Sequence, residues 1–223
     1  MAKRICDPTS GKIGNQVYQG GRNGQVVRTR AIPINPRSSA QRQARAYLTT
    51  ESRAWDGLTD AQRLAWTNAA KEVQSKSRLG MSGTLTGNQL FVKINTSLLT
   101  IGGDAVTAPP AVPSWEALPI TALTITNVSN VVAIKLTTTG APADGSMLRG
   151  AAPCNPGIAR CPDVAYLGTL DSPVSNAITI TAAYTARYGV PAVGKRVFVT
   201  VNQNIDGWQD IPLQFDAVVP AST

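Results

Sequence analysis

The sequence predicts an α+β protein with an N-terminal extended arm and β-hairpin, a small helical unit, and then an all-β sandwich. Three observations lead to this class. Glycine-rich turn residues separate two strand-like runs near the N-terminus, apolar residues then recur at helical spacing, and short alternating runs follow from about residue 123. We expect two domains, residues 1–105 and residues 106–223.

A β-hairpin is predicted near the N-terminus. Strand-like runs at residues 13–18 and 25–32 flank residues 20–24, which include an Asn-Gly pair. Both residues tolerate the positive φ angles that tight hairpin turns require. Along the second run, Arg28 and Arg30 alternate with Val27 and Thr29, so one face of the hairpin is expected to be cationic.

A first helix is predicted after an extended proline segment. Pro33 and Pro36 fix φ and disfavour helix in the residues before them. Ser38 or Ser39 is a suitable N-cap, and the helix is expected to end near Trp55. Its expected apolar stripe consists of Ala40, Ala44, Tyr47, Leu48 and Trp55.

Two further helices are predicted at about residues 60–75 and 88–99. Thr59 and Gln62 form a capping-box pattern, and Asp60 lies in the first turn, where the helix dipole favours an anion. Trp55 and Trp66 are expected to pack in the core of this helical unit. The residues expected to point inward are Ala61, Leu64, Ala65, Ala69 and Val73 in the first of these helices, and Leu90, Phe91, Ile94 and Leu98 in the second.

The remainder of the chain is predicted to be a β-sandwich. The segment 102–115 is rich in glycine and proline, which places a boundary near Val106. Six strands are expected, at residues 123–127, 131–138, 165–170, 177–181, 196–202 and 211–219. This spacing is typical of a sandwich of the immunoglobulin or fibronectin type III kind. Trp115 and either Tyr184 or Tyr188 are expected in its core, and Val132, Ile134, Leu136 and Thr138 share one face of the second strand.

Basic residues are concentrated in the N-terminal half. Residues 1–95 hold 15 Lys+Arg against 5 Asp+Glu, residues 96–223 hold 6 against 8, and no acid occurs between Asp7 and Glu51. The acid-free segment must find counter-charge on another molecule, so we expect an arm that binds a partner. Its candidate partner-binding residues are Arg22, Arg28, Arg30, Arg37, Arg42 and Arg45. Non-specific nucleic-acid binding by the same arm is the second interpretation, although the sequence carries no motif for base readout.

Several function classes are disfavoured. The chain contains no histidine, which excludes Ser-His-Asp and Cys-His catalysis, and a zinc site would need all three cysteines with a carboxylate. Four of the eight acids in residues 96–223 lie beside glycine or proline in predicted turns. We therefore expect no enzyme activity, catalytic residue, cofactor or metal, and we find no signal-peptide or membrane-spanning pattern. Cys154 and Cys161 allow either a disulfide or free thiols.

Residues 10–95 carry an ordered set of short motifs that resembles a family of small, mostly uncharacterised phage and prophage structural proteins. The motifs are SGKIG, a basic strand, NPR, AQ followed by R, WDGLTDAQRLAW, and GNQLFVKIN. The matching positions are Ser10, Gly11, Lys12, Gly14, Arg28, Arg30, Asn35, Pro36, Arg37, Ala40, Gln41, Arg45, Trp55, Leu58, Gln62, Arg63, Trp66, Gly87, Phe91 and Asn95.

The resemblance implies a tailed-phage virion component that assembles in the host cytoplasm, without a membrane partner. A capsid-decoration, cement or head-to-tail joining protein is expected, in several copies within a symmetric assembly. Its partners would be capsid, portal or tail subunits, with packaged DNA as a further candidate contact. The C-terminal half resembles the fibronectin-like modules of such virion proteins. An adhesion or carbohydrate-binding role of this half is the third interpretation.

Overall fold

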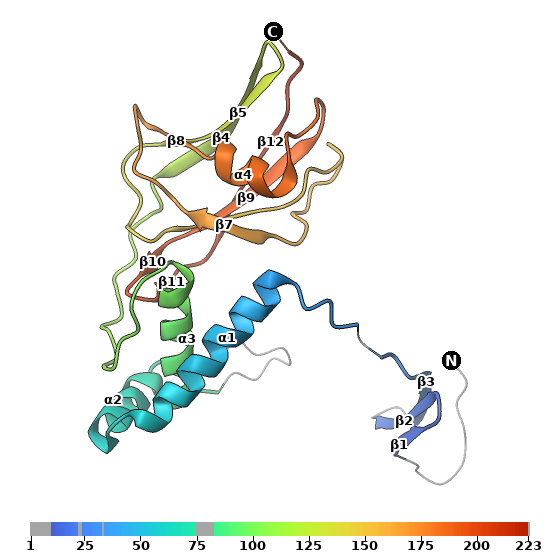
Figure 1. Ribbon diagram of the computed structural model, residues 1–223, viewed down its shortest axis with the longest axis vertical. Coiled ribbons are helices and arrows are strands. Elements are labelled where there is room, and N and C mark those ends of the chain that lie inside the picture. Colours follow the sequence, from blue (N-terminus) through green and yellow to red (C-terminus); the bar gives the residue numbers. More distant parts are fainter. Residues whose placement is uncertain (1–9, 22–23, 33, 75–82, 223) are drawn as a thin grey trace. The chain divides into compact units, whose positions relative to one another are not determined.

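The computed structural model describes residues 10–21, 24–32, 34–74 and 83–222 of the chain (Figure 1). Helices and antiparallel sheets both occur, so the α+β class is confirmed. Residues 1–42 form one compact unit and residues 43–223 form another. The helical part and the two larger sheets therefore belong to the same unit.

The N-terminal unit contains a three-stranded antiparallel sheet in the order β1-β2-β3, with strands Gly11–Ile13, Gln16–Gly21 and Gly24–Thr29. The predicted hairpin is confirmed as β2 and β3, whose last paired residues are Gly21 and Gly24. Its expected bounds are corrected, because the first strand begins at Gln16 and not at residue 13, and the second ends at Thr29 and not at residue 32. Arg22 and Asn23, between these strands, lie outside the described residues. Strand β1 was not predicted, because three residues are too short for an alternation pattern.

Three helices follow, and their starts agree with the capping signals in the sequence. Helix α1 is Ser39–Ala54, a short 3₁₀ turn η1 is Trp55–Gly57, α2 is Asp60–Ala70 and α3 is Gly87–Thr100. The Ser38 hydroxyl accepts a hydrogen bond from the Gln41 N–H at 3.3 Å. Capping boxes are present at the starts of α2 and α3, and each satisfies two backbone N–H groups that have no partner within the helix.

The helical core forms around Phe91 of α3. The Phe91 ring centroid lies 5.6 Å from that of Trp55 and 5.3 Å from that of Trp66, and the second pair is edge-to-face. The predicted core packing of both tryptophans is therefore confirmed, and so are the inward residues of α3, of which Leu98 is partly buried.

The predicted inward face of α2 is wrong in its first half. Ala61, Leu64 and Ala65 are exposed, whereas Trp66 and Ala70 are fully buried. The helix also ends at Ala70, five residues before the expected end near residue 75. The face that contacts Phe91 is the one that becomes buried.

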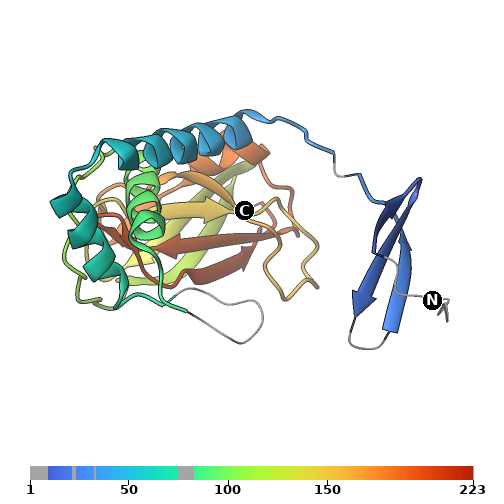
Figure 2. The ribbon, with the colours of Figure 1, turned by 90° about the horizontal axis from the view of Figure 1, so that it is seen from below.

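Two antiparallel sheets make up the β-rich part. One has the order β12-β9-β6-β7 and the other β4-β5-β8 (Figures 1 and 2). A single hydrophobic cluster contains residues of both sheets, among them Ile134 of β5 and Val199 of β9. The bounds are β4 Ile120–Val128, β5 Val131–Thr138, β6 Met147–Gly150, β7 Ala165–Thr169, β8 Ala177–Thr179, β9 Arg196–Asn202 and β12 Leu213–Val218. The predicted face of β5 is confirmed, because Val132, Ile134, Leu136 and Thr138 are all buried.

Sequence reasoning missed strand β6, a helix after β8, and two short strands at Asn204–Ile205 and Trp208–Gln209. Strand β6 has only four residues, yet it lies between β9 and β7 in its sheet. The strand expected at residues 177–181 stops at Thr179, and helix α4, Thr181–Tyr188, follows and ends at Gly189 with φ 75°. Tyr184 on α4 is fully buried as predicted, whereas the expectation for Trp115 is wrong, because its relative exposure is 37%.

A small hairpin joins the sheets to the helices. Its strands are β10, Asn204–Ile205, and β11, Trp208–Gln209. Trp208 is buried in the same cluster as Trp66 and Phe91. The side-chain amides of Asn204 and Gln209 both donate to Ser97 Oγ of α3, at 3.2 and 2.7 Å. Residues on either side of the expected boundary at 105/106 thus share one core (Figure 1).

Candidate functional site

The register of the N-terminal sheet brings basic side chains onto one face. Val17 of β2 pairs with Lys12 of β1 and with Arg28 of β3. Residues directly opposite each other project to the same side of a sheet, so Lys12, Val17 and Arg28 form a row. Arg30 follows Arg28 by two residues, and its backbone N–H donates to Asn15 O at 2.8 Å, which continues the pairing. We name Lys12, Arg28 and Arg30, all exposed, the basic face.

The opposite face of this sheet carries apolar side chains, and no second layer of the N-terminal unit packs on it among the described residues. Tyr18 and Val27 are paired neighbours on it and are half-buried, while Ile13 is 65% exposed. Neither hydrophobic cluster of the described residues includes a residue of this sheet. A small sheet without a covering layer has little intrinsic stability, so a partner that covered this face would stabilise it.

The structure does not bring all six predicted site residues together. Arg28 and Arg30 share the basic face, as the alternation predicted. Arg37 is exposed, with φ 47° and its N–H donating to Asn35 Oδ1 at 3.3 Å. Arg42 and Arg45 are exposed on α1, three residues apart, and the boundary between the two compact units falls directly after Arg42. Arg22 lies outside the described residues.

Lys12 is the basic-face residue that sequence reasoning did not select. Its place follows from the pairing of β1 with β2, which a three-residue strand does not reveal in advance. The signal that would have found it is the glycine turn. Gly14 has φ 56° and joins β1 to β2, so SGKIGNQ encodes a second tight hairpin.

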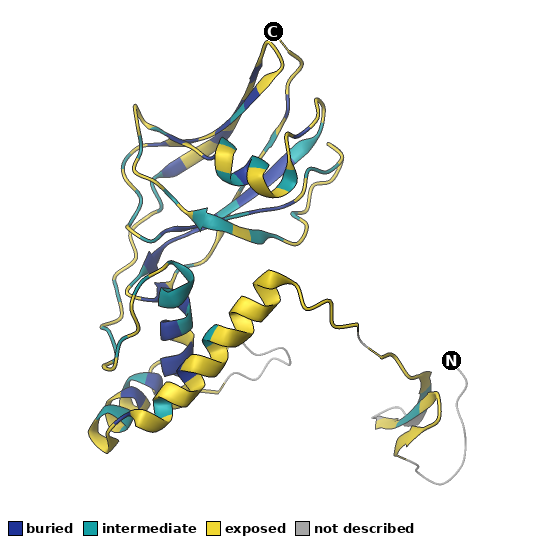
Figure 3. Cartoon of the chain, viewed as in Figure 1, coloured by how far each residue is buried: buried dark blue, intermediate teal, exposed yellow. Residues whose placement is uncertain are grey.

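Helix α1 is mostly exposed, and its predicted apolar stripe is wrong as a core face except for Trp55, which follows the helix and packs against Phe91 (Figure 3). Ala40, Ala44 and Leu48 are exposed, Tyr47 is half-buried, and the residue of α1 that is buried is Glu51. The carboxyl of Glu51 has an oxygen, Oε2, with no hydrogen-bond partner among the described residues. Burial raises the pKa of this carboxyl, because a low-dielectric environment disfavours its charged form.

We expect Glu51→Gln to stabilise the protein at neutral pH. The pKa of Glu51 is higher in the folded protein than in the unfolded chain, so between these two pKa values the folded protein binds more protons. The free energy of unfolding of the wild type therefore falls as pH rises through this range. The variant should therefore exceed the wild type in urea midpoint at about pH 7, and this advantage should shrink towards about pH 4. The exposed Glu72→Gln is the matched control. An advantage that is the same at both pH values would contradict the role of ionisation.

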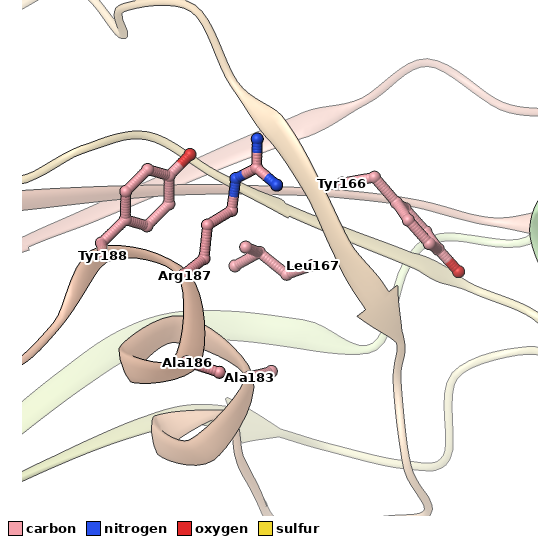
Figure 4. Close-up of a pocket in the computed structure, with 6 residues that line it drawn as sticks. All are labelled: Tyr166, Leu167, Ala183, Ala186, Arg187 and Tyr188. Atoms are coloured by element: carbon pink, nitrogen blue, oxygen red, sulfur yellow. The ribbon is translucent and has the colours of Figure 1, made fainter. Parts of the chain in front are cut away.

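A shallow hollow of about 580 Å³ lies between β7 and α4 (Figure 4). The side chain of Leu167 lies between those of Arg187 and Tyr166 in this view, and the other lining residues are Ala183, Ala186 and Tyr188 of α4. The hydroxyl of Tyr188 donates to Gly150 O at 2.8 Å, and the Arg187 guanidinium lies 5.8 Å from the Tyr188 ring centroid. An aromatic and cationic rim of this kind suits a polar ligand, but the Tyr188 hydroxyl already donates to a backbone carbonyl and the Arg187 guanidinium lies near the Tyr188 ring.

The carboxylates and cysteines of the described residues do not gather into a metal site, since no group of three or more His, Cys, Asp or Glu side chains has the required arrangement there. In the same part of the chain, no helix is long and apolar enough to cross a bilayer. Cys154 and Cys161 are free thiols, both half-buried.

The chain matches no protein-family model, no curated protein and no solved structure.

Proposed function

We propose that the protein is a structural component of a tailed-phage particle that docks onto an acidic surface of another virion subunit through its N-terminal unit. One observation carries the proposal. Residues 1–42 form a separate compact unit with a basic face and an open apolar face, in a segment that has no acid from residue 8 to residue 50. The resemblance of the motifs in residues 10–95 to phage structural proteins supports a place in a phage particle.

The mode of docking follows from the small size of the sheet. An exposed β3 edge and an open apolar face suit addition to a neighbouring sheet, and the basic face adds charge complementarity. In this proposal residues 43–223 stay folded independently of the partner, and the two larger sheets form an immunoglobulin-like or fibronectin-like sandwich displayed on the particle. Capsid decoration, cement and head-to-tail joining are all compatible with this arrangement.

The first test is the composition of purified particles. We expect mass spectrometry of intact particles from the source strain to detect the chain at a fixed ratio to the major coat protein. Its absence from washed particles would reject the proposal.

We expect the double charge reversal Lys12→Glu with Arg28→Glu to lower incorporation into particles by about tenfold or more, since an interface that loses two favourable charges and gains two like-charge contacts loses over about 1.4 kcal/mol. Lys135→Glu with Arg160→Glu is the matched control, because it changes net charge equally at exposed positions of the second unit. Quantitative mass spectrometry against the coat protein gives the ratio. Equal incorporation of the two variants would show that the basic face does not mediate docking.

Non-specific nucleic-acid binding is the second candidate. It is favoured by the exposed Arg42 and Arg45, which are neighbours on the surface of α1. In a mobility-shift series with random-sequence duplex DNA, this function predicts affinity that falls by about an order of magnitude or more between roughly 50 and 200 mM salt. The absence of a shift at the lowest salt would remove it.

A further inference from the structure

Cys154 lies at a fixed position beside the start of β9. Its backbone N–H donates to Arg196 O at 3.0 Å, and the Arg196 N–H donates back to Cys154 O at 2.9 Å. The Cys154 thiol is directed at the same carbonyl, with Sγ 3.5 Å from Arg196 O. These three contacts place Cys154 beside the first residue of β9, at one end of the four-stranded sheet.

The loop from residue 155 to residue 160 is exposed along its whole length but is tied back to the same place. Lys195 Nζ donates to Asn155 Oδ1 at 2.8 Å, and Arg196 Nη1 donates to Ile158 O at 3.2 Å. A turn within the loop closes through the Ile158 N–H and Asn155 O at 3.0 Å. Asn155 and Ile158 thus anchor the loop beside the start of β9, where Cys154 also lies.

The loop contacts limit where Cys161 can lie, because Cys161 follows Ile158 by three residues and the Ile158 carbonyl accepts a hydrogen bond from Arg196, the residue that pairs with Cys154. Burial raises the pKa of the Cys161 thiol most, and the nearby Cys154 and Asp216 side chains raise it further. Asp216 lies on β12 and forms an ion pair with Arg196 at 3.6 Å. Both thiols, Arg196 and Asp216 thus gather at one end of the sheet.

We propose that Cys154 and Cys161 are a reversible thiol pair, which a small-molecule disulfide oxidises to an intramolecular disulfide that closes the loop 155–160. A thiolate of one cysteine attacks a sulfur of glutathione disulfide, the glutathione S–S bond breaks and one glutathione thiolate leaves. The thiolate of the other cysteine then attacks the cysteine sulfur of the mixed disulfide and releases the second glutathione. The two cysteines lose two electrons and two protons, and one glutathione disulfide becomes two thiols.

This pair would be reduced in the cytosol and oxidised outside the cell. The closed loop would hold the Lys195 and Arg196 contacts in place by a covalent bond. The inference does not depend on the proposed docking function, because it rests on residues 154–161 and on the neighbouring end of the four-stranded sheet.

The full-length chain with Cys6→Ser gives a clean test, since it removes the third thiol, which lies outside the described residues. The folded variant is equilibrated with glutathione disulfide, quenched in acid, blocked at free thiols and digested with trypsin. Cleavage after Arg149, Arg160 and Arg187 separates Cys154 and Cys161 into peptides 150–160 and 161–187. We expect an intact mass lower by two hydrogen atoms, loss of both reactive thiols, and two peptides that stay linked until a reductant is added.

Cys6→Ser with Cys161→Ser is the control, and it should stop at the mixed disulfide with one glutathione attached. The proposal would be overturned if the Cys6→Ser chain, while folded, kept both thiols reactive. It would also be overturned if the chain gained glutathione at both cysteines without a link between the peptides.

Discussion

Trp66→Ala is expected to lower the free energy of unfolding by about 4 kcal/mol. Trp66 is fully buried, packs edge-to-face against Phe91, and its Nε1–H donates to Thr107 O at 2.9 Å. Truncation leaves a large cavity between α2 and α3 and removes the partner of a carbonyl at the start of the β-rich part. Urea unfolding followed by circular dichroism measures the loss.

Trp115→Ala is the matched control, because Trp115 is 37% exposed and lies outside both hydrophobic clusters of the described residues. It should cost less than about 1 kcal/mol. If Trp66→Ala does not fold, Trp66→Phe retains most of the ring and should lose about 2 kcal/mol through the missing hydrogen bond and the smaller volume. Equal urea midpoints for Trp66→Ala and Trp115→Ala would show that the helical core does not depend on Trp66.

Gly207→Ala is expected to destabilise the protein by about 3 kcal/mol or more. Gly207 has φ +85° in the turn between β10 and β11, and an added Cβ would lie 2.7 Å from both Cγ2 and the backbone O of Ile94. The Ile94 side chain can move away by rotating, but the Ile94 backbone oxygen is fixed by helix α3. The turn must therefore lift from α3, which weakens the hydrogen bonds that Asn204 and Gln209 donate to Ser97.

Gly194→Ala separates steric clash from backbone strain. Gly194 has φ +77°, but an added Cβ would meet no atom within 4 Å, so this variant should lose only about 1 to 2 kcal/mol. Tryptophan fluorescence gives a second readout, because lifting of the turn exposes Trp208 to water and shifts its emission to the red. If Gly207→Ala and Gly194→Ala lose the same free energy of unfolding and neither changes its tryptophan emission, the contact of the turn with α3 contributes little to stability.

The elements that sequence reasoning placed correctly are those whose determinants lie within a few residues. The Thr59 and Gln62 capping box is one example, because both partners belong to the same helical turn. The strand at residues 131–138 is another, since its alternation is intact from end to end. In the candidate site, the same alternation placed Arg28 and Arg30 on one face.

The wrong predictions concern which of two helix faces is buried, where both faces fit the same sequence pattern. Helix α2 offers one face with Leu64 and another with Trp66, and helical periodicity fits both. Contact with Phe91 selects the second, because edge-to-face packing and a hydrogen bond to Thr107 are available only there. In the same way, the stripe of α1 stays exposed because no described apolar layer covers it.

By itself, then, the sequence determined where the first three helices and most strands begin, and that positive charge gathers in the acid-free segment between Asp7 and Glu51, because caps, turns, alternation and charge are local properties. Only the tertiary structure decided which faces are buried, that β6 lies between β9 and β7, that Trp208 joins the helical core, and that Lys12 lies in line with Arg28. Each of these depends on partners that are distant in the chain or on a strand register, and burial and pairing energies are settled only when those surfaces meet.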